Sequence, residues 1–222
     1  MIDVKKYLLE LGVSKVGFAN VDGLAKEFID LPNGISLVLK LPKEAMHLID
    51  DEDYEAYWKC FHSKVAELSE IALKGEEYIK NLGHNAFALT MTRNECDMEK
   101  LLSILPYKTI ATKSGLGWIG RSALFVTPEY GSAVVLGAIL TDMPLEFDEP
   151  ITDSQCEECE NCQNACPVGA INPKKWNDRL NRNDIIDIDV CKEYIIDQYK
   201  NGLGCTKCMS ECKITQEYLK KR

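Results

Sequence analysis

The most constraining feature of this chain is a run of four cysteines between Cys156 and Pro167, spaced C-x2-C-x2-C-x3-C-P. This spacing is typical of bacterial proteins that bind two iron–sulfur clusters. In such proteins the first three cysteines bind one cluster and the fourth binds the other, so a second set of cysteines is required. That set is present downstream, as Cys191 and the run Cys205, Cys208 and Cys212.

The two cysteine sets supply four ligands for each of two clusters. In two-cluster ferredoxins the last cysteine of a run binds the other cluster, and by this analogy we assign Cys212 to the first one. The predicted ligands of the first [4Fe–4S] cluster are Cys156, Cys159, Cys162 and Cys212. The predicted ligands of the second [4Fe–4S] cluster are Cys166, Cys191, Cys205 and Cys208.

Disulfide bonds and zinc sites also use many cysteines, but both fit this spacing less well. Disulfide scaffolds are typical of exported proteins, and the sequence that starts at Met1 has no secretory signal. Zinc sites usually combine two separated C-x2-C pairs, whereas the first run ends in Cys-Pro. We therefore expect a protein of the reducing cytoplasm, in which Cys60 and Cys96 are left without a cluster.

The charge of the chain argues against non-specific binding of nucleic acid. The formal net charge is −9; residues 1–150 hold 15 basic and 23 acidic side chains, and residues 151–222 hold 11 and 12. Neutralisation of phosphates supplies most non-specific affinity, so an acidic chain binds nucleic acid poorly. Two small basic groups, Lys174–Arg182 and Lys220–Arg222, are interpreted as solvated surface. No apolar run approaches the ~20 residues of a membrane helix.

The residues before the cysteines alternate between helical and extended patterns. Between residues 53 and 82 apolar side chains recur every three or four positions, which indicates a helix packed against a core. The front of the chain is therefore α/β or α+β. Helices are predicted at residues 2–11, 53–82 and 106–113, and strands at 14–20, 34–41, 86–90, 123–127 and 133–141.

The acidic stretch 142–153, with two prolines, is predicted to link two domains. We expect an α+β fold with a front domain at residues 1–150 and a cluster domain at residues 151–222. The last two predicted strands of the front are joined by a turn at Thr127–Gly131.

A glycine motif, G-x-G-x-x-G, lies at Gly115, Gly117 and Gly120. In a dinucleotide-binding fold this motif follows a strand and begins a helix. Here a predicted helix precedes it and a predicted strand follows, so the nicotinamide interpretation is disfavoured. The glycines fit either a tight structural turn or a loop whose backbone approaches a ligand closely.

The glycine motif, together with segments on both sides of the first cysteine run, resembles the epoxyqueuosine reductase family. The resemblance covers most of the chain and is strongest over residues 106–212. It is carried by the segments 115–121, 124–132, 137–142, 156–166, 169–171 and 204–212.

The resemblance implies a nitroreductase-like front domain, a two-cluster ferredoxin-like module and a cobalamin between them. It further implies that electrons pass from the clusters to cobalt and then to the substrate, and that an external low-potential donor supplies them. On this basis the glycine motif is expected to lie against the corrin ring. The expected contact residues are Lys113, Gly115, Leu116, Gly117, Trp118, Gly120 and Arg121.

The chain departs from the family in two places. The family has an aspartate, expected to donate a proton, three residues before a proline, and here that position is Ser103. The nearest acid is Asp97, which becomes the candidate catalytic residue. The family also continues into helical repeats that help to hold tRNA, whereas this sequence ends ten residues after Cys212.

These departures disfavour tRNA as the substrate and favour a small molecule or a partner protein's redox centre. The alternative function is a non-catalytic electron carrier, or an activator that reduces the corrinoid of a partner protein.

Overall fold

The structure is a computed structural model that describes residues 3–94, 96–97, 102–103, 105–198 and 204–221. It combines helices with short sheets, so the expected α+β class is confirmed. The chain groups into two compact units, each assembled from several segments: residues 1–39, 64–116 and 135–151 form the first unit, and residues 40–63, 117–134 and 152–222 form the second. The predicted domains, 1–150 and 151–222, stay a prediction.

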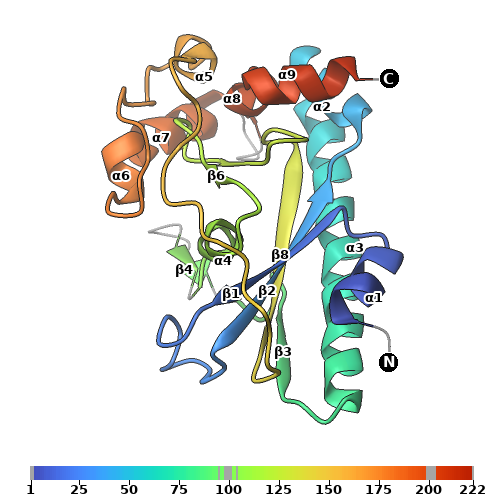
Figure 1. The fold of residues 1–222 in the computed structure, drawn as a ribbon. Coiled ribbons are helices and arrows are strands. Elements are labelled where there is room, and N and C mark those ends of the chain that lie inside the picture. The colour runs from blue at the N-terminus through green and yellow to red at the C-terminus, as the bar shows by residue number, and fades with distance from the viewer. Residues whose placement is uncertain (1–2, 95, 98–101, 104, 199–203, 222) are drawn as a thin grey trace. The chain divides into compact units, whose positions relative to one another are not determined.

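The first unit is built on a four-stranded sheet with the order β1-β2-β8-β3 (Figure 1). Strand β1 (Lys15–Asn20) runs antiparallel to β2 (Asn33–Lys40), and β3 (Ala86–Leu89) runs antiparallel to β8 (Val134–Thr141). The two inner strands, β2 and β8, are buried along nearly their whole length. This agrees with their continuous apolar sequences, since a strand covered on both faces needs no polar alternation.

Three helices belong wholly or partly to the first unit. They are α1 (Val4–Glu10), the C-terminal part of α3 (Tyr54–Asn81) and α4 (Tyr107–Lys113). Helix α4 lies against β1. A Cβ atom on Gly75 of α3 would lie 2.5 Å from the Cδ1 of Ile139 on β8, so glycine lets the helix approach the sheet closely.

The acidic stretch predicted as a linker is attached to the first unit. Phe18 and Asp148 exchange two hydrogen bonds: the Phe18 N–H donates to the Asp148 carboxylate at 2.8 Å, and the Asp148 N–H donates to the Phe18 carbonyl at 3.0 Å. Further along, the Ile151 N–H donates to the Thr112 carbonyl at 2.9 Å. These long-range bonds could not be inferred from composition, which indicated only an acidic, proline-containing segment.

The second unit contains a small hairpin formed by β6 (Trp118–Ile119) and β7 (Phe125–Val126). The predicted strand at 123–127 is thus shorter, and β7 pairs with β6 in a sheet separate from that of β8. Residues Thr127 and Gly131 do close a turn, since each donates its N–H to the carbonyl of the other. The predicted turn is confirmed, but it joins strands of two different sheets.

Helix α2 (Lys43–Asp50) of the second unit was not predicted, because Pro42 was interpreted only as the end of a strand. Pro42 is also the residue that caps α2. The other helices of this unit are mostly short, and several of them carry cysteines of the two runs. They are α5 (Asn161–Asn164), α6 (Arg182–Ile185), α7 (Ile188–Gln198), α8 (Lys207–Ser210) and α9 (Lys213–Lys220), together with the N-terminal part of α3.

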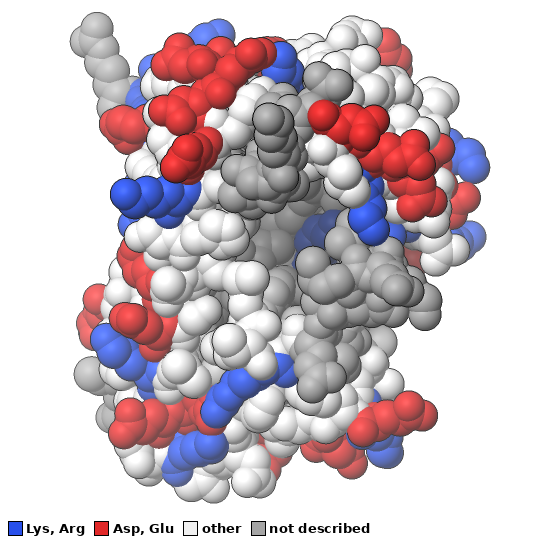
Figure 2. Space-filling model, turned by 180° about the vertical axis from the view of Figure 1, so that it is seen from behind, with Lys and Arg blue, Asp and Glu red and all other residues white. Residues whose placement is uncertain are grey.

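Charges of both signs are interspersed on the face of the molecule drawn in Figure 2. Two lysines of the basic group after the first cysteine run have acidic partners: Lys175 lies 2.7 Å from Glu158, and Lys174 lies 3.6 Å from Asp184. These pairs agree with the interpretation of that group as solvated surface. In the described part of the chain, no helix combines the length and the apolar character that crossing a membrane requires.

Candidate metal centre

The first cysteine run forms a tight turn and then a single turn of helix. The Cys159 N–H donates to the Cys156 carbonyl at 3.0 Å, and Cys162 lies on α5. Glu157, between the first two cysteines, has a left-handed backbone with φ +49°. An L-residue adopts this conformation at a cost in energy, so such residues gather where a loop is shaped for a ligand or a turn.

The second run has the same feature. Thr206 follows Cys205 as Glu157 follows Cys156, and its φ is +52°. Cys205 itself has φ +61°. Cys208 then lies on α8 and Cys212 caps α9. Both C-x2-C turns therefore contain a left-handed residue directly after their first cysteine.

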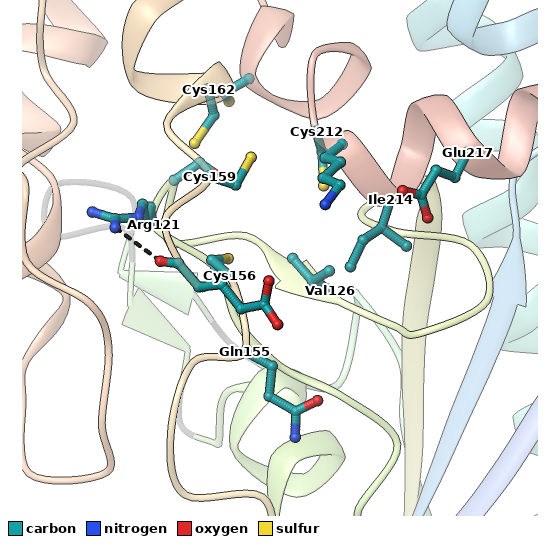
Figure 3. Close-up of a pocket in the computed structure, with 14 residues that line it drawn as sticks. Arg121, Val126, Gln155, Cys156, Cys159, Cys162, Cys212, Ile214 and Glu217 are labelled. Carbon is teal, nitrogen blue, oxygen red and sulfur yellow. Dashed lines mark hydrogen bonds between the residues drawn. The ribbon is translucent and has the colours of Figure 1, made fainter.

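The cysteines predicted to bind the first cluster lie close together. Burial, followed by the sulfurs of the three other predicted ligands, raises the pKa of the Cys162 thiol to about 11. All four line one cavity of about 240 Å³ in the second unit (Figure 3). A ligand sulfur must be a thiolate, so binding of a positively charged iron core there would release protons that burial otherwise retains.

The other four cysteines form a second group. Burial raises the pKa of the Cys191 thiol, and the sulfurs of Cys205 and Cys166 add to the effect. Burial also raises the pKa of Cys208, with further contributions from all three of these sulfurs and from Cys162. The structure thus brings the eight cysteines together in the second unit, and Cys208, which also lines the cavity of the first four, adjoins both predicted groups. Their roles as ligands stay a prediction.

The cavity of the first group fits an anionic cluster in two respects. Gly120 leaves little room for a side chain: a Cβ atom there would lie 2.9 Å from the Cγ2 of Val126, which would have to shift, and 3.7 Å from the Sγ of Cys156. The guanidinium of Arg121 is buried beside the cysteines, and its Nε has no hydrogen-bond partner among the described residues.

No three Cys, His, Asp or Glu side chains among the described residues are grouped so as to hold a single metal ion. A single zinc would require four sulfurs at ~2.3 Å from one ion. In a four-iron cluster each cysteine binds a different iron atom, so the sulfurs stand farther apart.

The residues expected to contact a corrin ring are divided between the two units at Leu116 and Gly117. In the first unit, Lys113 ends α4, Leu116 packs against Gly17, and Gly115 has φ +66° with the Glu149 carbonyl next to it. Contacts within the chain therefore account for Gly115 and Leu116.

In the second unit, Gly117 and Trp118 belong to the β6–β7 hairpin. A Cβ atom on Gly117 would collide with the backbone carbonyl of Val126. Trp118 is buried, and its Nε1 has no hydrogen-bond partner among the described residues. Gly120 and Arg121 line the cysteine cavity instead. That all seven residues contact a corrin ring stays a prediction.

Asp97 lies on β4 (Cys96–Asp97), which pairs antiparallel with β5 (Leu102–Ser103). Cys96 is opposite Ser103, and Asp97 is opposite Leu102. Ser103 stands where the family has its aspartate, and its partner on the neighbouring strand is Cys96. The candidate acid, Asp97, is the next residue after that partner. The side chain of Asp97 lies outside the part that the structure describes.

The resemblance implies that Arg121 contacts a corrin ring, whereas the structure places Arg121 beside the first cysteine group. The only signal available was its place at the end of the glycine motif. The residues that it contacts lie 36 to 52 positions away, at Glu157, Gln163 and Pro173.

No protein-family model matches the chain. A curated protein named epoxyqueuosine reductase, from Listeria monocytogenes, is 34% identical over 109 residues, which are 46% of this chain and 28% of that protein. The chain thus matches less than a third of that relative's length.

Two solved structures have a similar fold. A reductive dehalogenase, whose structure is described as suggesting a mechanism for B12-dependent dehalogenation, superposes with a TM-score of 0.75 at 18% identity, over 94% of this chain and 31% of the other. An epoxyqueuosine reductase bound to an epoxyqueuosine-modified tRNA stem loop superposes with a TM-score of 0.65 at 18% identity, over 96% of this chain and 64% of the other. In sequence the chain is therefore similar to epoxyqueuosine reductases over about half of its length, and in fold it is similar to an epoxyqueuosine reductase and a reductive dehalogenase.

Proposed function

We propose that the protein is an iron–sulfur oxidoreductase that holds two [4Fe–4S] clusters and passes electrons from an external low-potential donor to a substrate through a bound cobalamin. The observation that carries the proposal is the gathering of eight cysteines within one compact unit, where the four predicted ligands of the first cluster line one cavity. A disulfide or a single zinc would need only part of this arrangement. The proposal assumes the reducing cytoplasm expected from the sequence.

The cobalamin is supported by the likeness to a B12-dependent dehalogenase and to an epoxyqueuosine reductase. When bound, cobalamin supplies a metal centre that can be reduced and can then transfer electrons to a substrate. The part of this chain would be to bind and orient the cofactor, exclude water and supply protons. Lys113 and Gly115–Arg121 are the proposed contact region.

Epoxyqueuosine in tRNA is the first substrate to test. The likeness to an enzyme solved with a tRNA stem loop supports it, whereas Ser103 and the acidic charge of the chain favour a small substrate. The side chain at position 103 bears on the rate of this reaction. Ser103 cannot act as the acid that an opening epoxide requires, and Asp97 on the paired strand is the proposed donor.

The experiment is an anaerobic purification with iron analysis, followed by incubation with cobalamin and by an assay with epoxyqueuosine-containing tRNA and a strong reductant. We expect about eight iron atoms per chain, four for each cluster. We also expect cobalt to remain bound after gel filtration. Zinc in place of iron would overturn the proposal.

The second candidate function is an electron carrier without a cobalamin. It is favoured by the contacts of Gly117, Gly120 and Arg121, which are all made within the chain itself. A carrier would hold iron and sulfide, would retain no cobalt, and would reduce a partner's redox centre but no tRNA. The cobalt content after gel filtration therefore separates the two functions.

A further inference from the structure

Arg121 is almost completely buried, with 4% of its surface exposed, and it makes three hydrogen bonds. One terminal nitrogen, Nη1, donates to the Pro173 carbonyl at 2.8 Å and to the Gln163 Oε1 at 3.3 Å. The other, Nη2, donates to the Glu157 carbonyl at 3.1 Å, which is the bond drawn in Figure 3. All three acceptors are uncharged.

These acceptors surround the first cysteine run. Glu157 follows Cys156, Gln163 follows Cys162 on α5, and Pro173 lies beyond the end of the run. A single side chain thus ties together the C-x2-C turn, the helix after it and the segment beyond. The three bonds start from two separate nitrogens of a rigid, planar fork, so the single ammonium nitrogen of a lysine could not replace all of these contacts.

Among the residues that the structure describes, no carboxylate lies within ion-pair distance of the Arg121 guanidinium. No ion pair in the described part of the chain involves it, and its buried Nε has no hydrogen-bond partner there. The nearby acid Glu158 is fully exposed and forms an ion pair with Lys175. Lys175 is the main cause that lowers the pKa of Glu158, and the charge of Arg121 makes a smaller contribution. An exposed carboxylate of this kind is screened by solvent and compensates a buried charge poorly.

A buried and unpaired charge is costly unless an opposite charge lies nearby. The cysteines lining the same cavity as Arg121 would supply that charge as thiolates on a cluster. A positive charge beside a cluster favours its reduced form, which carries one more electron.

We propose that Arg121 is a positioning residue of the first cluster, which holds the loop of Cys156 to Cys162 and raises the reduction potential of that cluster by its buried charge. This inference rests on the proposed function, because it requires that the first group of cysteines binds a cluster. It differs from the corrin contact that the resemblance implies for the same residue.

The experiment compares Arg121→Met and Arg121→Lys with the parent protein, each reconstituted anaerobically with iron and sulfide. The measurements are iron content and a dithionite redox titration followed by electron paramagnetic resonance. A Cys191→Ala background removes a predicted ligand of the second cluster, so the remaining signal is assigned to the first. Arg179→Met is the matched control, since it removes an exposed cation from the same unit.

For Arg121→Met we expect the one-electron reduction of the first cluster to become at least about tenfold less favourable, a shift of ~59 mV to lower potential. Arg121→Lys should restore most of the potential, because the charge is kept, but should lose iron faster when a chelator is added. Arg179→Met should leave both quantities unchanged, because solvent and salt screen an exposed charge.

An unchanged potential in Arg121→Met with full iron content would overturn the proposal while leaving the clusters established. If Arg121→Met retains no iron, the Arg121→Lys protein decides the matter. The proposal is supported if the equilibrium constant for reduction of its first cluster lies within twofold of the parent's and the protein loses iron faster than the parent. It is refuted if Arg121→Lys retains iron as well as the parent does. Absence of iron in the parent protein would instead refute the proposed function.

Discussion

A Cβ atom on Gly120 would lie 3.7 Å from the Sγ of Cys156, a residue 36 positions later in the chain. Glycine at this position adds no side chain to the wall of the cysteine cavity. The last glycine of the G-x-G-x-x-G motif thus belongs to the predicted site of the first cluster. The sequence motif and the cysteine run, which are separate in the chain, meet at one place.

The number of clusters can be measured directly. Anaerobic reconstitution should give about eight iron atoms per chain, and Cys162→Ala should lose the first cluster, or about four of them. Cys60→Ala is the control, because Cys60 belongs to neither group, and its iron content should equal that of the parent. Equal iron content in Cys162→Ala would contradict the ligand assignment.

Gly117 and Gly120 should respond differently to an added methyl group. Gly117→Ala should destabilise the protein by about 1–3 kcal/mol, because the methyl group would meet the fixed carbonyl of Val126. Gly120→Ala should mainly weaken retention of iron, because its new methyl group meets the side chain of Val126 and narrows the cysteine cavity. Thermal unfolding and iron release to a chelator check the two effects.

The result for Gly117 also tests its predicted contact with a corrin ring. A Gly117→Ala protein that folds with parental stability but loses cobalamin would favour the ring contact. Loss of stability with unchanged cobalamin affinity would favour the structural turn.

Glu76 should make the stability of the protein depend on pH. Burial disfavours its charge, but hydrogen bonds from Lys80, the Ala88 N–H and Arg93 outweigh this effect and hold the pKa of the carboxyl below its ordinary value of 4.5. Because the folded pKa is lowered, the stabilisation is complete above pH 4.5 and is lost as the pH falls through the folded pKa.

Glu76→Gln should therefore lower the free energy of unfolding by about 1–3 kcal/mol at neutral pH, and the difference should shrink below pH 4.5. Urea unfolding at several pH values checks this. Glu77→Gln, a change at the exposed neighbouring residue, should have little effect at any pH. A difference between Glu76→Gln and the parent that does not depend on pH would refute the assignment.

Because Ser103 stands where the family has an acid, we expect that restoring an acid there increases activity. If the protein reduces epoxyqueuosine in tRNA, Ser103→Asp should raise the rate, by a factor of up to about 10²–10⁴ for a well-placed proton donor. The asparagine in Ser103→Asn has a shape similar to that of aspartate but no acidic proton to donate, so this variant should not raise the rate. Single-turnover assays with the reduced protein distinguish them.

Asp97→Asn tests the remaining proton donor in the same assay. We expect the Asp97→Asn protein to react much more slowly than the parent. In the Ser103→Asp background, the same Asp97→Asn change should have little effect on the rate, because the new aspartate can donate the proton. A parental rate in the Asp97→Asn protein would exclude Asp97 from the reaction.

The sequence alone determined the elements whose signals are local. The long helix, the inner strands and the turn at Thr127–Gly131 were predicted because side-chain periodicity and turn residues act over a few positions. The gathering of the cysteines in one unit was predicted as well, because the spacing of cluster ligands can be recognised in the sequence. Their roles as ligands stay a prediction.

Only the tertiary structure decided which distant segments meet. The attachment of Asp148 to Phe18, the pairing of β7 with β6 and the hydrogen bonds of Arg121 link residues that share no pattern. A buried arginine and an exposed one look the same in a sequence, because burial depends on the packing of the whole unit. For this reason the sequence located the cysteines, and the fold placed Gly120 and Arg121 beside them.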